Sequence, residues 1–184
     1  MLTQTFKTAF AKQAEKLGAS ASKFIAVKDI PLGHWTRLKC QYGCGSYGKN
    51  LCCPPYTPDA DTMEKLLQEY KGACLVQYTC SLTDPEDWSE IDRKMSQDLL
   101  AILLALEKMA FTQNYYKAFA LKAGNCYLCP ECTLTTCRFP HKARPSMEAC
   151  GIDVFALVRQ AGFKIKVLPE HTHELQVYGL ILLE

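Results

Sequence analysis

Two short and widely separated blocks hold most of the cysteines of this chain. Of the 11 cysteines, four lie between positions 40 and 53 and four lie between positions 126 and 137. An odd total does not suit a disulfide framework, because each bridge consumes two thiols. Thiols gathered at such spacings are typical of metal or redox sites. We therefore expect two loops whose shapes are set by what they bind.

The second block predicts an iron–sulfur cluster. It contains two consecutive C-x2-C steps and a fourth cysteine after four more residues: Cys126, Cys129, Cys132 and Cys137. This is close to the bacterial ferredoxin run C-x2-C-x2-C-x3-C-P, with one residue inserted before the fourth cysteine. A cuboidal cluster is larger than a single ion, so a thiolate at every third residue can bind three of its corners. One or two 4Fe–4S clusters are therefore the expected cofactor.

The first block supplies further candidate ligands. In ferredoxins with two clusters the fourth cysteine of a run binds the other cluster. One expected ligand set therefore joins the last cysteine of the second block to three from the first: Cys137, Cys40, Cys44 and Cys53. The other cluster, on the first three cysteines of the second block, then needs Cys52 or Cys150 as its last ligand. If neither reaches it, one iron stays open to water or to a small-molecule substrate.

Zinc is the alternative metal. It also accepts four thiolates, but its sites commonly pair two C-x2-C knuckles separated by a dozen or more residues, and the second block lacks that gap. Knuckles from both blocks can still combine, for instance Cys40 and Cys44 with Cys126 and Cys129. Thiols without any metal are the remaining reading. A dinucleotide loop is disfavoured, because the G-x-G-x-x-G match at residues 43–48 contains a cysteine and is not followed by a helical pattern.

A basic patch follows the second block directly and consists of Arg138, His141, Lys142 and Arg144. Such charges can offset the negative charge of a thiolate-bound cluster, dock an acidic redox partner, or grip a substrate carboxylate or phosphate. Three of these residues, Arg138, Lys142 and Arg144, are our candidates for cofactor binding.

Composition excludes several partners. With 21 Lys and Arg against 19 Asp and Glu, the net charge of +2 gives no field that would attract a nucleic acid. No apolar run approaches the length of a membrane span, and the N-terminus lacks the features of a secretory signal. We expect a cytoplasmic protein that binds neither nucleic acid nor membrane. Its 184 residues are enough for a single domain, 1–184, with a buried core.

Hydrophobic periodicity predicts alternating helices and strands. Helices are expected over 3–17, 59–71, 84–109 and 152–162, the third beginning at Asp84-Pro85, and strands over 24–27, 73–79, 116–121, 163–168 and 175–183. The expected fold is α/β, a single layered domain with a mixed sheet flanked by helices. Both cysteine loops, 40–55 and 126–150, are expected at one end of it. Cys74 and Cys80 are expected to be buried.

Two longer motifs give a family resemblance. They are C-x3-C-G-x-Y-G…C-P-P over 40–55 and C-x2-C-x2-C…C-R-x-P-x-K-A-R-P-S-M-E-A-x-G-I-D-V over 126–154. With them the chain resembles a family of uncharacterised prokaryotic proteins described as predicted metal-binding proteins. The resemblance implies a cysteine-bound metal centre, with Cys40, Cys44, Cys53, Cys126, Cys129, Cys132 and Cys137 as ligands. It also implies supporting positions at Arg138, Arg144, Glu148 and Asp153.

Three functions stay open from the sequence. The first is an iron–sulfur protein that exchanges single electrons with a partner oxidoreductase. The second is an enzyme or accessory protein with an open iron on a three-cysteine cluster, and the third is a zinc-stabilised binding module. Whether the chain is an enzyme stays open.

Overall fold

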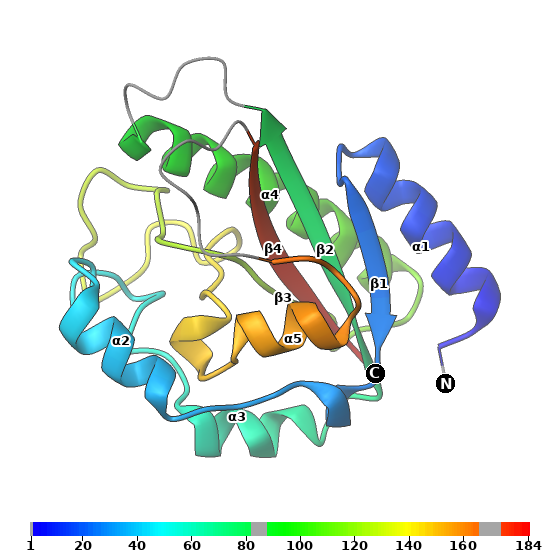
Figure 1. Ribbon diagram of the computed structural model, residues 1–184, viewed down its shortest axis with the longest axis horizontal. Coiled ribbons are helices and arrows are strands. Elements are labelled where there is room, and N and C mark those ends of the chain that lie inside the picture. The colour runs from blue at the N-terminus through cyan, green and yellow to red at the C-terminus, as the bar shows by residue number, and fades with distance from the viewer. Residues whose placement is uncertain (1, 82–87, 166–173) are drawn as a thin grey trace.

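The computed structural model describes residues 2–81, 88–165 and 174–184. Helices and strands alternate along the chain (Figure 1). In order they are α1 (Gln4–Lys16), β1 (Ala21–Ile25), the 3-10 helix η1 (Val27–Asp29), α2 (Trp35–Gly43), α3 (Ala60–Leu67), β2 (Gly72–Ser81), α4 (Trp88–Thr112), β3 (Phe119–Leu121), the 3-10 helix η2 (Glu148–Cys150), α5 (Val154–Gln160) and β4 (Glu174–Leu183).

Three of the helices begin at capping side chains. Thr3 accepts the Phe6 N–H at the start of α1, and Asp59 accepts the Thr62 N–H at the start of α3. Asp153 caps α5 in the same way, since its carboxylate accepts the Ala156 N–H at 2.9 Å. A cap satisfies backbone donors that have no partner inside the helix, so these residues fix where each helix begins.

The four strands form one sheet in the order β1-β2-β4-β3. The fold class is confirmed, but each strand pairing in the described sheet is antiparallel, where we expected a mixed sheet. The reason is the place of the last strand. β4 lies between β2 and β3 and runs opposite to both, so β2 and β3 are parallel to each other without being neighbours.

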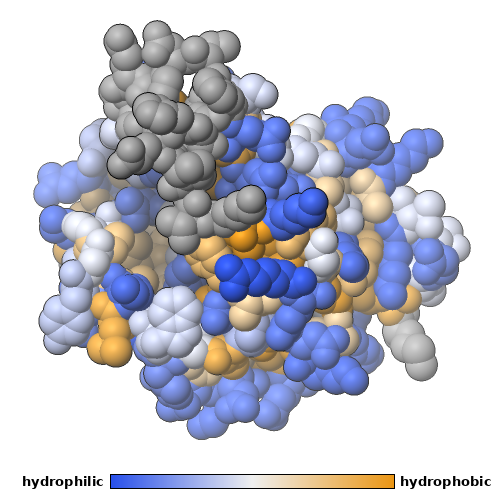
Figure 2. Space-filling view, viewed as in Figure 1, coloured by the Kyte–Doolittle hydropathy of each residue, from blue (hydrophilic) through white to orange (hydrophobic). Residues whose placement is uncertain are grey.

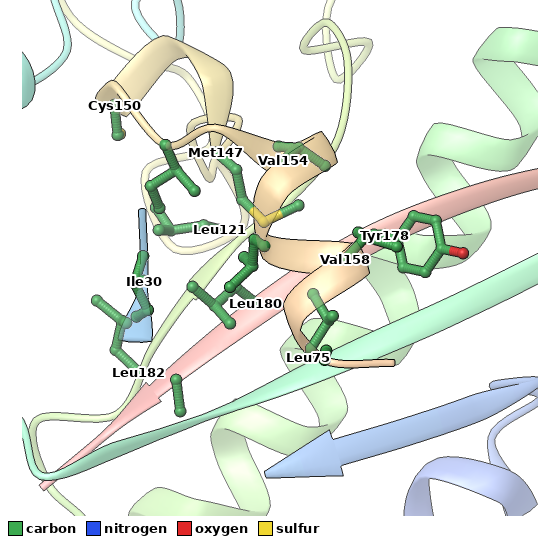
Figure 3. Packing of buried hydrophobic residues seen from close by; sticks show 14 of the residues in the cluster. Ile30, Leu75, Leu121, Met147, Cys150, Val154, Val158, Tyr178, Leu180 and Leu182 are labelled. Carbon is green, nitrogen blue, oxygen red and sulfur yellow. The ribbon is translucent and has the colours of Figure 1, made fainter. Parts of the chain in front are cut away.

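Helices cover both faces of the sheet (Figure 1). Alternate residues of β2 face opposite layers: Leu75 packs with α3 and α5, and Val76 packs with α1 and α4. In β4, Leu180 and Ile181 divide in the same way. Figure 3 shows the first of these layers, where residues of η2 and α5 pack onto the sheet. Two buried faces explain why residues 73–76 of β2 and 180–183 of β4 are uninterrupted apolar runs.

The secondary-structure prediction held for most elements and failed in identifiable places. Helix α2 was not predicted, although it carries Cys40. The strand expected over 163–168 is not found over 163–165, and its remainder lies outside the described residues, as does the Asp84-Pro85 start. No described helix combines the length and apolarity needed to cross a membrane.

Both cysteine loops lie at one end of the sheet. Figure 1 places the segment after α2 and the segment between β3 and η2 at the same side of the molecule, on the left. The second segment leaves and returns at one point, because the Lys122 N–H donates to the Pro145 carbonyl and the Lys122 carbonyl accepts the Met147 N–H, each at 2.9 Å. The loop is therefore closed at its base by backbone hydrogen bonds.

Candidate metal centre

The cysteines of the two loops line two separate cavities. The first, here called the Cys40 cavity, has a volume of about 150 Å³ and is lined by Cys40, Cys44, Tyr47, Cys53, Pro54, Gly124, Asn125, Ser146, Glu148 and Ala149. The second, the Cys126 cavity, has about 20 Å³ and is lined by Asn50, Leu51, Cys52, Cys126, Leu128, Cys129, Cys132, Thr133, Cys137 and Arg138. Each cavity draws on both loops.

The adjacent cysteines Cys52 and Cys53 line different cavities. Cys53 lines the Cys40 cavity, while Cys52 lines the Cys126 cavity. Both residues are buried, at 9% and 8% exposure. The doubled cysteine, which left the third ligand of the first block open, thus contributes one thiol to each site.

Cys137 lies with its own block. It lines the Cys126 cavity together with Cys129 and Cys132, and not the cavity of Cys40 and Cys44, where the ferredoxin pattern placed it. The zinc arrangement that joins Cys40 and Cys44 to Cys126 and Cys129 would have to draw on both cavities, since the two pairs line different ones. The run 126–137 folds so that its fourth cysteine lines the same cavity as the first three.

Cys52 and Cys126 connect the two loops directly. The Cys52 thiol hydrogen-bonds to the Cys126 sulfur, which also accepts the backbone N–H of Leu128. These bonds, opposed by burial and aided by the nearby Lys122, lower the pKa of Cys126 from 9.0 to about 6. The pKa of Cys52 is raised, mainly because its proton is held in that hydrogen bond. An N–H that turns toward a sulfur is the backbone arrangement that thiolate-bound centres require.

Lys122 is a buried cation beside both cavities. It is 1% exposed, and its ammonium donates to Ser96 Oγ at 2.7 Å and to the carbonyls of Ala123, Gly124 and Asn125. Burial lowers its pKa, while the neighbouring thiols of both sites oppose that shift. The ammonium therefore fixes the start of the second loop and offsets thiolate charge. Sequence reasoning missed it, because a lone lysine after a short strand carries no recognisable pattern.

The basic residues after the second block take different roles. Arg144 is buried at 9% exposure and forms a two-pronged ion pair with Glu107 of α4, with Nε to Oε2 at 2.9 Å. Its guanidinium also lies 5.0 Å from the Phe119 ring centroid. Arg138 is exposed and lines the Cys126 cavity, and Lys142 is exposed on the surface. Arg144 thus anchors the loop to α4, and Arg138 alone of our three candidates lines a cysteine cavity.

The three cysteines outside the blocks lie elsewhere. Cys150, the other candidate for a last ligand, is 1% exposed and packs in the apolar layer shown in Figure 3, with Met147 and Ile30. Cys74 is buried in the opposite layer, as expected. Cys80 is only half-buried and lies near the end of β2, where the burial of the strand decreases.

Glu148 is the acidic residue in the lining of the Cys40 cavity. It begins η2, which packs against α2 and so brings the carboxyl group near Cys40. Burial raises the pKa of the Cys40 thiol, and the negative charges of Cys44 and Glu148 raise it further. Burial also raises the pKa of Glu148 itself. The sequence nominated Glu148 only as a supporting position.

The model of a protein family described as predicted metal-binding protein (DUF2284) matches residues 23–183. The chain belongs to this family. Comparison with the curated proteins and with the solved structures finds no match. The expected membership of a metal-binding family is confirmed, while the assignment of individual cysteines as ligands stays a prediction.

The thiol groups in both cavities are suitable metal ligands, which agrees with the description of the family as metal-binding. Thiolates are soft ligands that select zinc, copper(I) or iron–sulfur clusters over magnesium or calcium. The volumes differ, at about 150 Å³ for the Cys40 cavity and about 20 Å³ for the Cys126 cavity. Among the described residues, no three His, Cys, Asp or Glu side chains converge closely enough to hold a single ion. The thiols of either set must therefore shift to bind one.

Proposed function

We propose that this protein holds iron–sulfur clusters in its two cysteine-lined cavities and exchanges single electrons with a partner oxidoreductase. The observation that carries the proposal is the gathering of eight cysteines, from two distant blocks, around two neighbouring cavities at one end of the fold. Clusters bound there would supply one-electron redox chemistry. The proposal places the protein in the cytoplasm, where thiols stay reduced.

Residues around the thiols would influence the reduction potential of clusters bound there. The Leu128 N–H that donates to the Cys126 sulfur withdraws negative charge from that thiolate. The buried Lys122 ammonium favours the state with more negative charge on the neighbouring thiolate centres, which is the reduced state. Both effects raise the reduction potential relative to the same thiolates in an apolar cavity.

Helix α2 supplies a surface for the partner. Trp35, Leu38 and Tyr42 are 47%, 57% and 79% exposed and follow one another at helical spacing toward the exposed Cys44. Figure 2 shows orange and pale side chains over the region of α2, among hydrophilic neighbours. Exposed Arg138 and Lys142 lie on the other cysteine loop. Aromatic side chains on the segment of one cysteine block and basic residues on that of the other suit an acidic protein partner.

A zinc site is the second candidate, and the size of the Cys126 cavity favours it there. At about 20 Å³ it is the smaller of the two cysteine-lined cavities, and a single ion needs less room than a four-iron cluster. Zinc bound to four of the thiols that line it would fasten the second loop to the first and would take no part in electron transfer.

Metal and sulfide analysis of protein purified without oxygen separates the two candidates. The proposal expects a brown protein that contains iron and acid-labile sulfide in equal amounts, with an electron paramagnetic resonance signal that appears on reduction. Zinc without sulfide would contradict it and would establish the zinc site. A colourless protein without either metal would overturn both.

A further inference from the structure

The Cys40 cavity offers one thiol fewer than a four-coordinate metal requires. Its lining contains three cysteines, whereas the lining of the Cys126 cavity contains five. Sites with three protein ligands keep a fourth position for water, a substrate or another side chain. The residue that stands at this position decides whether the centre is closed or open.

An oxygen atom of Glu148 is placed to take that position. Within the described part of the chain, Oε2 of Glu148 has no hydrogen-bond partner, and solvent does not reach it even though other parts of the residue are exposed. A buried carboxylate oxygen without a donor is unfavourable, because it has lost its hydrogen bonds to water and gained none in the protein. A metal ion in the adjoining cavity would supply the missing partner.

The surroundings of Glu148 hold its carboxylate in place. The Ser146 hydroxyl accepts the Ala149 N–H at 3.1 Å, which leaves its own proton to donate to Glu148. The backbone N–H of Glu148 provides a second donor to the same carboxylate. Hydrogen bonds of this kind orient carboxylate ligands in metal sites. Both donors favour the ionised carboxylate, and its Oε2 atom is left without a partner among the described residues.

We propose that the Cys40 cavity is a metal centre with three thiolate ligands, Cys40, Cys44 and Cys53, and one carboxylate ligand, Glu148. Zinc and iron both accept such mixed sets. The carboxylate oxygen is the hardest ligand of the four and binds a soft-ligand centre least tightly, so it is the ligand that an incoming small molecule displaces. The inference rests on metal binding at this cavity, but it does not depend on whether the metal is zinc or the iron of a cluster.

Cobalt(II) titration of the reduced, metal-free full-length chain tests the ligand set. Cobalt bound to thiolates shows charge-transfer absorption that grows with the number of thiolates, so the spectrum counts them. The variants are Glu148→Gln, which keeps the shape of the side chain, and Glu148→Cys, which provides a fourth thiol. Glu131→Gln, an exposed glutamate between Cys129 and Cys132, is the matched control, and Cys53→Ser identifies which cobalt belongs to this cavity.

One cobalt site should be lost in Cys53→Ser, and that site belongs to the Cys40 cavity. The proposal expects Glu148→Gln to lower the cobalt affinity of that site by at least about tenfold and to leave the affinity of the other site unchanged. Glu148→Cys should retain tight binding and add the absorption of one thiolate, and Glu131→Gln should match the parent. Parent affinity and parent spectrum in both Glu148 variants would overturn the carboxylate ligand. The proposal would also be overturned if Cys53→Ser removed no cobalt absorption. The proposed iron–sulfur function is tested separately, by iron and sulfide analysis.

Discussion

The thiol of Cys52 hydrogen-bonds to the sulfur of Cys126, so the two cysteine blocks touch through their own side chains. The next residue, Cys53, lines the other cavity, beside Cys40 and Cys44. One short turn of the first loop thus sends neighbouring thiols to two different sites. The two loops therefore meet at this turn, while each of its thiols lines its own cavity.

This division predicts opposite effects for two neighbouring substitutions. Cys52→Ser should reduce the metal held by the second block and leave the Cys40 cavity loaded, because Cys52 contributes only to the Cys126 cavity. Cys53→Ser should do the reverse. Metal content, together with the spectrum of the centre that remains, measures both effects on protein purified without oxygen.

Cys80→Ser is the matched control for these two variants, because Cys80 lies half-buried at the end of β2 and lines neither cavity. It should keep the full metal content. Identical spectra from the Cys52 and Cys53 variants would contradict the assignment of the two thiols to separate sites.

The sequence predicted the elements with a buried face and missed those without one. Helix α1 was found because Phe6, Phe10 and Ala14 recur at helical spacing and pack on the sheet. Helix α2 was missed because its apolar side chains face solvent and Thr36 is its buried residue, so it carries no inward-facing stripe. Periodicity reports burial, and an exposed helix next to a glycine-rich loop gives little of it.

Cysteine spacing located the candidate site but could not assign each cysteine to one of the two cavities. The two cysteine blocks identified both loops, yet the direction of each thiol depends on backbone turns that cysteine spacing does not specify. The ferredoxin pattern therefore grouped Cys137 with Cys40, Cys44 and Cys53, whereas its side chain lines the cavity of its own block. Spacing also left open which of Cys52 and Cys53 is a ligand, and the ligand assignment stays a prediction. The resemblance implied Glu148 only as a supporting position. Its place in the cavity lining and the role of Lys122 depend on contacts between segments far apart in the chain.

The lowered pKa of Cys126 predicts selective alkylation of the metal-free protein. Thiolate is the reactive form, and its fraction rises as the pH rises through the pKa. With a pKa of about 6, Cys126 should reach half of its maximal rate with iodoacetamide near pH 6. Cys53, whose pKa burial raises to about 11, should stay nearly unreactive at neutral pH.

Mass spectrometry of the labelled peptides gives both rates, and circular dichroism checks that the metal-free chain is folded. Cys52→Ala is the informative comparison, since alanine removes the thiol that donates to Cys126. The half-maximal pH of Cys126 should then rise. A Cys126 midpoint near the ordinary value of 9.0 in the parent would contradict the hydrogen bond between the two sulfurs.

Lys122→Met should weaken both metal sites and the fold. The substitution leaves the carbonyls of residues 123–125 without their common donor, and hydrogen bonds to charged groups contribute about 1.5–3 kcal/mol each. We expect lower metal content and a free energy of unfolding reduced by at least about 2 kcal/mol, measured by urea denaturation. Lys49→Met, an exposed change in the first loop, should leave both unchanged.

Gly151→Ala should destabilise the turn that carries Glu148. Gly151 has a φ of +83°, and a Cβ there would lie 2.8 Å from the Ala60 Cα atom, which belongs to the backbone of α3. Gly18 also has a positive φ, +98°, but a Cβ there meets open space. Gly18→Ala should therefore cost about 1–2 kcal/mol of unfolding free energy from backbone strain alone. Gly151→Ala should cost clearly more, and equal losses in thermal or urea denaturation would contradict the contact with α3.

Arg144→Met should reveal how strongly the second loop is anchored to α4. The side chains of Arg144 and Glu107 are 11% and 14% exposed, so removal of the arginine leaves a nearly buried carboxylate without its counter-charge. The expected loss of unfolding free energy is about 3–5 kcal/mol. Lys142→Met, an exposed change in the same segment, should lie within about 0.5 kcal/mol of the parent.

A second substitution separates charge from hydrogen bonding at this pair. Glu107 also accepts the Ala120 N–H at 2.7 Å, so the carboxylate holds β3 as well as the loop. Arg144→Met combined with Glu107→Gln removes the unpaired charge and keeps an acceptor for that N–H. The double variant should therefore be more stable than Arg144→Met alone in urea denaturation, because an uncompensated buried charge costs more than the loss of the pair. A double variant less stable than the single one would show that the lost hydrogen bonds, and not the stranded charge, dominate at this anchor.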